Sequence, residues 1–271
     1  MPELPEVETV MRGLGPVLSG SFIKRVTLNR PNLRYHFDDK MIERLQGKKC
    51  LGLRRRGKYI WMDMDGGDTL VIHLGMSGSF TINPTAIKKH DHVLFETEKG
   101  DIIAYNDPRR FGFMIFVKTG FEHDHKSFSK MGVEPLGNEF NGMALRDKLK
   151  TKKTPVKVAL LDQSVVAGVG NIYACEALYM SGISPLRQSD KITRAQADDL
   201  AQSIRDVLNA AIQSGGSSLR DHRQTDGTMG YFQHSFAVYD RAGEKCRETG
   251  GEIKRIVQGG RSTFYCPKKQ K

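Results

Sequence analysis

The chain has 271 residues, enough for two domains or for one large domain with a small appended module. Its 42 Lys and Arg residues outnumber its 31 Asp and Glu residues, and the formal charge of +11 favours a polyanionic partner, either nucleic acid or an anionic membrane surface. No apolar run approaches the roughly 20 residues of a membrane span, and the start of the chain lacks the pattern of a secretory signal. We therefore expect a cytoplasmic protein with no membrane partner, for which nucleic acid is the better candidate.

An N-terminal helix followed by β structure is the first pattern along the chain. Apolar residues recur at helical spacing from Val7 to Leu18, which predicts a helix over about residues 5–18. Between about 22 and 117, stretches such as KYIWMDMDGGDTLVIHL are rich in β-branched and aromatic residues and contain turn sequences such as DGGD. We expect this region to form an antiparallel β-sandwich or barrel with the helix packed on it.

Helical signals then dominate to about residue 215. Thr193 and Gln196 have the spacing of a capping box, an apolar stripe follows, and Gly215 can end that helix. Beyond about 236, GEIKRIV and RSTFYC flank a Gln258-Gly259-Gly260 turn and predict one β-hairpin. The expected fold class is α+β and multidomain, with a β unit, a helical domain and a small C-terminal hairpin module.

The first candidate for chemistry is the N-terminus. If the initiator Met is removed, Pro2 presents a secondary amine that is about 2.4 pKa units less basic than a lysine amine. Its attack on an aldehyde-like carbon gives an iminium ion, an electron sink suited to elimination, and Glu3 and Glu6 could move the protons. The same PELPEVE sequence is also an ordinary helix start, in which the helix dipole favours acidic residues. Both interpretations stay open from the residues alone.

Two basic runs could face phosphates. In RRRGKYI, strand alternation would put Arg56 and Lys58 on one face of the strand and Arg55 on the other. These side chains therefore cannot all face one ligand. Such a run is also typical of a solvated strand edge. RDKLKTKKTPVK, at 146–157, is either a phosphate-facing patch or a solvated helix.

Glycine-bounded turns supply the remaining candidates. Gly168 and Gly170 precede a helix expected near Asn171; the match to a dinucleotide loop is weak, but such a turn can bind phosphate through backbone N–H groups. HLGMSG and NDPRRFG carry large side chains of the types that enter a base stack and fill the space of a displaced base, although each alone is equally well a core or surface residue. These side chains are Met76, Arg109 and Phe111.

The combination of these segments closely resembles the bacterial formamidopyrimidine-DNA glycosylases. The resemblance runs in order from residue 2 to residue 267, through MPELPEVETV, RRRGKYI, HLGMSGSF, KHDHV, NDPRRFG, GVEPLG, VAGVGNIYACEAL, QSGGSSLRD, GYFQHSFAVYDRAGEKC and GRSTFYCP. It implies an N-terminal helix plus antiparallel β-sandwich over 1–130, a helix-two-turn-helix domain over 131–222, and a lesion-capping loop with a C-terminal finger-like hairpin over 223–271.

The resemblance also implies a reaction. The family excises oxidised purines, such as 8-oxoguanine and formamidopyrimidines, from duplex DNA and then cuts the strand by β- and δ-elimination. At the matching positions, Pro2 would form the Schiff base at C1′, with Glu3 as acid/base at the sugar ring and Glu6 in support. Lys58 would act in β-elimination and contact phosphate, while Arg261 would contact the flanking phosphates and donate a proton in δ-elimination.

The resemblance assigns DNA contacts as well. Met76, Arg109 and Phe111 would fill the gap left by the flipped base, and the segment from about 217 to 231 would close over that base. Further residues would hold the DNA backbone: His90, Arg109, Lys152, Lys157 and Asn171. We expect a monomer on damaged double-stranded DNA, associated with the nucleoid and needing no cofactor for the reaction. The alternatives are an endonuclease VIII-like enzyme for oxidised pyrimidines and a non-catalytic protein that binds damaged DNA.

The finger departs from the family pattern. The family carries four cysteines with C-x₂-C-x₁₆-C-x₂-C spacing, of which only Cys246 and Cys266 are present, because Thr249 and Lys269 occupy the partner positions. Two thiolates with threonine and lysine cannot complete the tetrahedral site of structural zinc. We therefore expect a zincless finger with no metal ligands, supported by apolar residues of its strands, namely Ile253, Val257, Phe264 and Tyr265. A disulfide is not expected in a reducing compartment.

Overall fold

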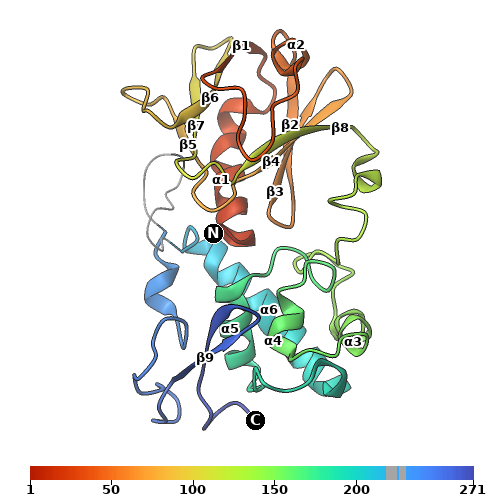
Figure 1. Cartoon of the computed structure of the whole chain (residues 1–271), viewed down its shortest axis with the longest axis vertical. Helices are drawn as coiled ribbons and strands as arrows, with labels where there is room; N and C mark the ends of the chain where they lie inside the picture. Colours follow the sequence, from red (N-terminus) through yellow and green to blue (C-terminus); the bar gives the residue numbers. More distant parts are fainter. Residues whose placement is uncertain (218–224, 226–229) are drawn as a thin grey trace. The chain divides into compact units, whose positions relative to one another are not determined.

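The computed structural model describes residues 1–217, 225 and 230–271. Two compact units divide the chain: Met1–Ser129 with Ser214–Tyr231, and Lys130–Gln213 with Phe232–Lys271 (Figure 1). The three-part division into 1–130, 131–222 and 223–271 stays a prediction. Among the described residues, no helix has the length and apolarity that a membrane crossing requires.

The first unit combines a helix with two antiparallel sheets, as expected. Helix α1 (Leu4–Leu18) precedes the strands, and a short α2 (Met41–Leu45) follows the first of them. One sheet has the order β1 (Ile23–Leu28), β6 (Asp91–Thr97), β7 (Ile102–Asn106) and β5 (Ser79–Ile82). The other has the order β2 (Cys50–Arg56), β3 (Tyr59–Met64), β4 (Asp68–His73) and β8 (Phe113–Lys118).

Helix α1 packs against strands of both sheets and closes their common core. It contacts β2, β3 and β5, and its apolar stripe of Val7, Val10, Leu14 and Leu18 is buried. This is the stripe that the 3.6-residue period predicts, and each buried Val or Leu side chain contributes roughly 1.5–3 kcal/mol of transfer free energy. The packing fixes the start of the helix, and therefore the N-terminus, relative to the sheets.

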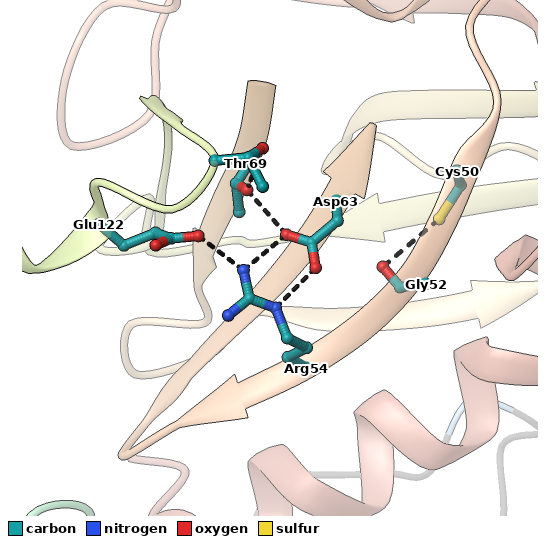
Figure 2. A network of polar contacts seen from close by, with 7 residues as sticks. Cys50, Gly52, Arg54, Asp63, Thr69 and Glu122 are labelled. Atoms are coloured by element: carbon teal, nitrogen blue, oxygen red, sulfur yellow. Dashed lines mark hydrogen bonds and ion pairs between the residues drawn. The ribbon is translucent and has the colours of Figure 1, made fainter. Parts of the chain in front are cut away.

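A polar network ties the chain after β8 to the second sheet. The Arg54 guanidinium donates to both oxygens of Asp63, at 2.6 and 2.8 Å, and to Glu122 at 2.6 Å in the 3-10 helix η1 (Glu122–Asp124). Thr69 donates to the same Asp63 carboxylate at 2.7 Å (Figure 2). Because the Arg54 contact with Asp63 is bidentate, it has a more defined geometry than an ordinary surface ion pair.

The second unit begins with helices. They are α3 (Gly142–Lys150), α4 (Val156–Leu160), α5 (Asn171–Met180) and α6 (Arg194–Gln213), with 3-10 turns η2 (Ser189–Lys191) and η3 (Phe232–Ser235). The capping box before α6 is confirmed: Gln196 N–H donates to the Thr193 hydroxyl at 3.2 Å, and Thr193 N–H donates to the Gln196 side chain at 3.1 Å. Gly215 has the positive φ of 74° that favours glycine beyond a helix end.

The chain ends in the expected hairpin. Strands β9 (Lys254–Gln258) and β10 (Arg261–Tyr265) pair antiparallel and are joined by Gly259 and Gly260, both with positive φ. Strand β10 contacts helix α5. Ile253, Phe264 and Tyr265 are buried as supports of the hairpin, but Val257, which we also expected to support it, is 69% exposed. The strand alternation of β9 turns Val257 to the solvent side, so that expectation was wrong.

Candidate active site and nucleic-acid interface

The start of α1 holds the predicted acidic pair in a buried setting. Pro2, Glu3 and Glu6 are all buried. Glu3 N–H donates to the Glu6 carboxylate at 2.8 Å, one half of a capping box. The other Glu6 oxygen accepts from the backbone N–H and the hydroxyl of Ser217, both at 2.9 Å. Glu6 therefore joins the N-terminus to the segment that follows α6.

The N-terminal amine lies among the predicted catalytic groups. Burial lowers the pKa of the Met1 amine; Glu3 and Glu6 act in the opposite direction, while Lys58 and Arg109 act in the same direction as burial. A lowered pKa leaves more of an amine as the unprotonated nucleophile at neutral pH. The structure thus brings Glu3, Glu6, Lys58 and Arg109 within electrostatic range of the first amine of the chain.

Lys58 lies in a turn and not in a strand, contrary to the expected alternation with Arg56. Strand β2 ends at Arg56 and β3 begins at Tyr59, so Gly57 and Lys58 form the two-residue hairpin turn, with Gly57 at a positive φ of 55°. The expected alternation does not extend to Lys58, because the turn interrupts the period of two. The neighbouring Arg55 donates to Glu8 of α1 at 2.6 Å, so part of this basic run supports the fold.

The three predicted gap-filling residues line one cavity. It has a volume of about 610 Å³ and is lined by Met1, Asn32, Leu33, Arg34, His73, Gly75, Met76, Arg109, Arg110 and Phe111. Met76 and Phe111 are 41% and 45% exposed, although both are large and apolar. The Arg109 guanidinium lies 5.0 Å from the centre of the Phe111 ring. An exposed apolar pair with a guanidinium beside it is suited to stacking against bases.

His73 lines the same cavity and was missed from the sequence. Burial, followed by the charges of Lys58 and Arg34, lowers the pKa of His73 to about 4, so the ring is neutral at neutral pH. Gly75 N–H donates to its Nδ1 at 3.1 Å, and the ring stacks on Phe113 at 5.1 Å. The only signal in the sequence was its place three residues before Met76 in HLGMSG.

His90 lies at the turn before β6 and does not belong to the residues described as lining the cavity. Its carbonyl accepts the Asp107 N–H at 3.0 Å, and its ring lies 6.0 Å from that of His92. It is therefore held close to the loop that carries Arg109 and Phe111.

The second unit joins Lys157, Asn171 and the strand of Arg261. Lys157 is fully buried, and its ammonium donates to Asn171 Oδ1 at 2.6 Å. The Asn171 amide nitrogen donates to the carbonyl of Ser262 at 2.9 Å, directly after the exposed Arg261. Lys152 instead donates to Asp162 at 2.7 Å and is part-exposed. The first residue of α5 is thereby tied both to a buried cation and to the hairpin.

The segment expected to close over a flipped base, about 217–231, lies largely outside the described residues. Within it, Ser217 and Tyr231 form an isolated antiparallel bridge. Thr225 is buried, and its carbonyl accepts the Ile82 N–H at 3.2 Å.

The finger has pairwise contacts where the family pattern would place four ligands. The Thr249 hydroxyl lies 3.3 Å from Cys266 Sγ, and the Tyr179 hydroxyl lies 3.2 Å from Cys246 Sγ. Lys269 forms an ion pair with Glu248 and lies 4.4 Å from the centre of the Tyr179 ring. Within the described part of the chain, no group of three or more His, Cys, Asp or Glu residues could hold a metal ion. These side chains do not fit a four-ligand zinc site.

Burial opposes ionisation of Cys246, but hydrogen bonds involving Thr249 and Tyr179 outweigh it and lower the pKa of this thiol to about 6. A second anchor lies nearby, because the buried Glu176 carboxylate accepts the backbone N–H groups of Ala237, Val238 and Tyr239 at 2.8–3.0 Å. The finger is therefore attached to α5 by hydrogen bonds at both of these places.

Comparison with known proteins agrees with this arrangement. Models of the formamidopyrimidine-DNA glycosylase N-terminal domain and H2TH domain match residues 1–114 and 131–223. The formamidopyrimidine-DNA glycosylase of Ruegeria pomeroyi is 52% identical, with all of both chains covered. That of Jannaschia sp. is 53% identical over 98% of this chain and 99% of the relative.

Solved structures show the same similarity. The MutM (Fpg) protein of Thermus thermophilus has a TM-score of 0.89 at 38% identity, covering 99% of this chain and 98% of that one. The Lactococcus lactis Fpg in complex with DNA containing an abasic site has a TM-score of 0.90 at 33% identity, covering 99% of both. Together the fold and the matched domains define a DNA glycosylase with a helix-two-turn-helix domain. The chain belongs to the formamidopyrimidine-DNA glycosylase family.

Proposed function

We propose that the protein removes oxidised purines from duplex DNA and then cleaves the strand at the resulting abasic site. The observation that carries the proposal is the start of α1, where Pro2, Glu3 and Glu6 are buried together and Lys58 lies within electrostatic range of the first amine of the chain. Within the same unit, the cavity lined by Met1 is also lined by Met76, Arg109 and Phe111. This repair reaction requires a nucleophile and side chains that occupy the space left in the base stack by the flipped nucleotide.

The chemistry begins with removal of Met1, which transfers the free amine to Pro2. The Pro2 nitrogen attacks C1′ of the damaged nucleotide, and the base leaves with the electron pair of the broken bond. The base takes up one proton to balance the proton lost by the Pro2 nitrogen, and the sugar ring opens to an iminium ion as its ring oxygen is protonated. Glu3 moves the proton at the sugar ring, and Glu6 holds the helix start through its contact with the Glu3 backbone. The cationic iminium then accepts electrons during elimination of the 3′ phosphate and, after a second proton loss, the 5′ phosphate. Lys58 assists the first elimination and Arg261 the second.

Damaged double-stranded DNA is the proposed partner. Relatives have been solved with DNA containing carbocyclic 8-oxo-G and with DNA containing Fapy-dG, at 34% identity to this chain. Met76, Arg109 and Phe111 would occupy the gap left by the flipped base. Four residues would hold the phosphates, namely His90, Arg109, Lys152 and Asn171, and Lys157 would support them indirectly. Since Lys157 is buried against Asn171, it acts by orienting the Asn171 amide, and Lys152 must exchange Asp162 for phosphate.

We propose that the finger functions without zinc and positions the Arg261 guanidinium against the DNA backbone. At the positions of the family's metal ligands, the Tyr179 and Thr249 hydroxyls contact the two thiols and Lys269 pairs with Glu248, while the apolar cluster that includes Ile253 and Phe264 supports the hairpin. We further propose a monomeric cytoplasmic enzyme that needs no cofactor, with a catalytic domain over 1–130, a DNA-binding domain over 131–222, and a capping loop and finger over 223–271.

The decisive experiment is borohydride reduction of the protein mixed with duplex DNA that contains 8-oxoguanine. We expect a covalent protein–DNA adduct whose peptide map places the linkage at Pro2. Retention of Met1 by mass spectrometry, or absence of an adduct, would contradict the lyase mechanism. Excision assays on duplexes that differ only in the lesion distinguish the substrate classes. A strong preference for oxidised pyrimidines over 8-oxoguanine would show that the substrates are not oxidised purines.

A further inference from the structure

Two loops of the first unit carry the three proposed gap-filling side chains. One loop joins β4 to β5 and contains Met76, and the other joins β7 to β8 and contains Arg109 and Phe111. Strands β5 and β7 pair with Ser79 opposite Asn106, so the two loops leave the sheet side by side. Neither loop has regular secondary structure of its own, and something else must therefore fix their shape.

Asp107 is a buried carboxylate at the base of both loops. Its exposed fraction is 0%, and one oxygen accepts the Ser77 hydroxyl at 2.6 Å. The other oxygen accepts the Gly112 N–H at 2.8 Å. Ser77 in turn accepts the Arg109 N–H at 3.2 Å. A single side chain thus connects the residue after Met76 to the backbone on both sides of Phe111.

The Asp107 main chain closes the second loop further. Its carbonyl accepts the Arg110 N–H at 3.2 Å and lies 3.0 Å from His92 Nε2. Arg110 has a positive φ of 57°, a conformation that non-glycine residues rarely adopt. The loop therefore holds a strained turn between its two gap-filling residues, and surrounding contacts must maintain it.

The two loops also meet backbone to backbone. A Cβ atom on Gly75 would lie 2.3 Å from the Gly112 nitrogen and 2.4 Å from the Phe111 carbonyl carbon. A Cβ atom on Gly112 would lie 1.9 Å from the Tyr105 hydroxyl. Tyr105 is fully buried, and burial, reinforced by Asp107, raises the pKa of its hydroxyl, which remains a neutral donor to Asp107 at 3.4 Å. Glycine is required wherever the contact is this close.

We propose that Asp107 is a positioning residue that holds Met76, Arg109 and Phe111 as one preformed wedge. This role rests on the proposed function, because it assumes that these three side chains enter the base stack. The physical reason is preorganisation: loops fixed before binding do not lose conformational entropy when they insert. Hydrogen bonds to an ionised acceptor are the stronger kind, and a buried carboxylate with fixed donors keeps both loops in register.

The first test replaces Asp107 by Ala and by Asn and measures single-turnover excision from a duplex containing 8-oxoguanine. We expect D107A to slow excision by about 10- to 100-fold, since it removes the hydrogen bonds that Ser77, Gly112 and Tyr105 donate to the carboxylate. D107N should recover part of the loss, because an amide keeps the shape and one acceptor. Cleavage of a preformed abasic site should change by less than about threefold, because no base has to be displaced from the stack.

A direct readout of the wedge uses a fluorescent 2-aminopurine next to the lesion. Opening of the stack by the wedge raises its emission, and we expect a smaller rise with saturating D107A than with the wild-type protein. S77A is a milder variant, because it removes the hydroxyl contacts to Asp107 and to the Arg109 N–H but leaves the Gly112 N–H on the Asp107 carboxylate. It therefore tests the proposal even if D107A does not fold. We expect S77A to slow excision by about three- to tenfold in the same direction.

D63N is the matched control, because Asp63 lies in the same unit, accepts from Arg54 and Thr69, and has no hydrogen bond among those described for the two loops (Figure 2). It should lower the melting temperature and leave excision and fluorescence unchanged. The positioning role is wrong if D107N and S77A give the same excision rate and the same 2-aminopurine emission as the wild-type protein. It is also wrong if D63N slows excision as much as D107N does. A wild-type protein that neither excises nor forms the borohydride adduct would instead overturn the proposed function, and the role of Asp107 with it.

Discussion

The wedge loops around Asp107 and the finger around Cys246 and Cys266 are both held by a few side-chain contacts, but by different chemistry. In the wedge loops, one carboxylate accepts several donors, so the loops depend on a single buried group. In the finger, the thiols contact the Tyr179 and Thr249 hydroxyls, and an ion pair and Glu176 add independent supports. Removal of Asp107 should therefore disturb both loops together, whereas the finger should keep its conformation when any one of its separate contacts is removed.

This difference explains how two of the four cysteines in the family pattern can be absent while the hairpin persists. A zinc site stabilises isolated fingers by about 10–16 kcal/mol, and each hydrogen bond contributes only about 1 kcal/mol. The finger therefore cannot replace the metal contact for contact. It relies on packing against the helical unit, where Cys175, Tyr179, Ile253 and Phe264 share one apolar cluster. The comparison predicts steep losses where one buried carboxylate of the first unit serves the reaction, and graded losses from changes in the finger.

The largest effect is expected from Glu3→Gln. The variant keeps the size and the helix-capping geometry of Glu3 but removes the carboxylate that would move the proton at the sugar ring. Since general acid–base catalysis contributes about 100- to 10,000-fold, we expect base excision to fall at least 100-fold, measured by single-turnover kinetics. Glu8→Gln is the matched control on the same helix, where Glu8 accepts from Arg12 and Arg55. Equal losses in the two variants would mean that Glu3 acts through the stability of α1.

The next effect is expected from Arg261→Ala, which removes the exposed guanidinium that the finger presents. If Arg261 contacts phosphate and assists the second elimination, β-elimination products should accumulate and strand cleavage should slow by about tenfold or more. The slope of the logarithm of the binding constant against the logarithm of salt concentration should decrease in magnitude by about one, as expected for the loss of one phosphate contact. Arg255→Ala, on the neighbouring strand, is the control and should leave the product ratio unchanged. An unchanged ratio in R261A as well would exclude a role in elimination.

The parts predictable from sequence are those with a local signature. Helix α1, the strand pairs around turn sequences, the capping box at Thr193 and the hairpin follow from periodicity and turn chemistry, which depend on neighbours in the chain. Met76, Arg109 and Phe111 could be named because glycine-bounded segments frame them, and the structure places all three on one cavity.

The parts that could not be predicted depend on tertiary contacts. The role of Asp107 arises only when β5 pairs with β7 and brings Ser77 beside it, and the burial of Lys157 depends on helix α5 and its Asn171. His73 reads as an ordinary strand end until the cavity forms around it. Lys58 was assigned to a strand because the short turn at Gly57 and Lys58 lies inside a single basic run between two strands, where the alternation could not be seen to break.

A metal-gain variant tests the finger from the opposite direction. Thr249→Cys combined with Lys269→Cys restores the C-x₂-C-x₁₆-C-x₂-C spacing, so we expect about one zinc per chain by elemental analysis. The melting temperature should rise by roughly 5 °C with zinc and fall on chelation. The wild-type protein should bind less than about 0.1 zinc per chain under the same conditions. Stoichiometric zinc in the wild type, removable with loss of activity, would show that the pairwise contacts do not replace the metal.

The smallest effect concerns the Thr249 hydroxyl and pH. The pKa of Cys246 is lowered from 9.0 to about 6, so the folded state favours the thiolate more than the unfolded state does. The stability that this provides is complete above about pH 9 and is lost as the pH falls toward 6, because the unfolded state then binds the additional proton. We expect the melting temperature of the wild type to decline over that interval. A thiolate absorbance that is absent from C246S should titrate near pH 6.

Thr249→Val should raise the pKa of Cys246 and flatten the pH dependence of the melting temperature. It should also lower the free energy of unfolding at pH 8 by about 1 kcal/mol, the contribution of one hydrogen bond. Thr151→Val, which loses a hydroxyl contact to the Lys148 carbonyl in the same unit, should shift stability equally at every pH. A parallel pH profile in T249V and T151V would mean that the finger does not depend on its thiolate, and that apolar packing alone maintains the hairpin.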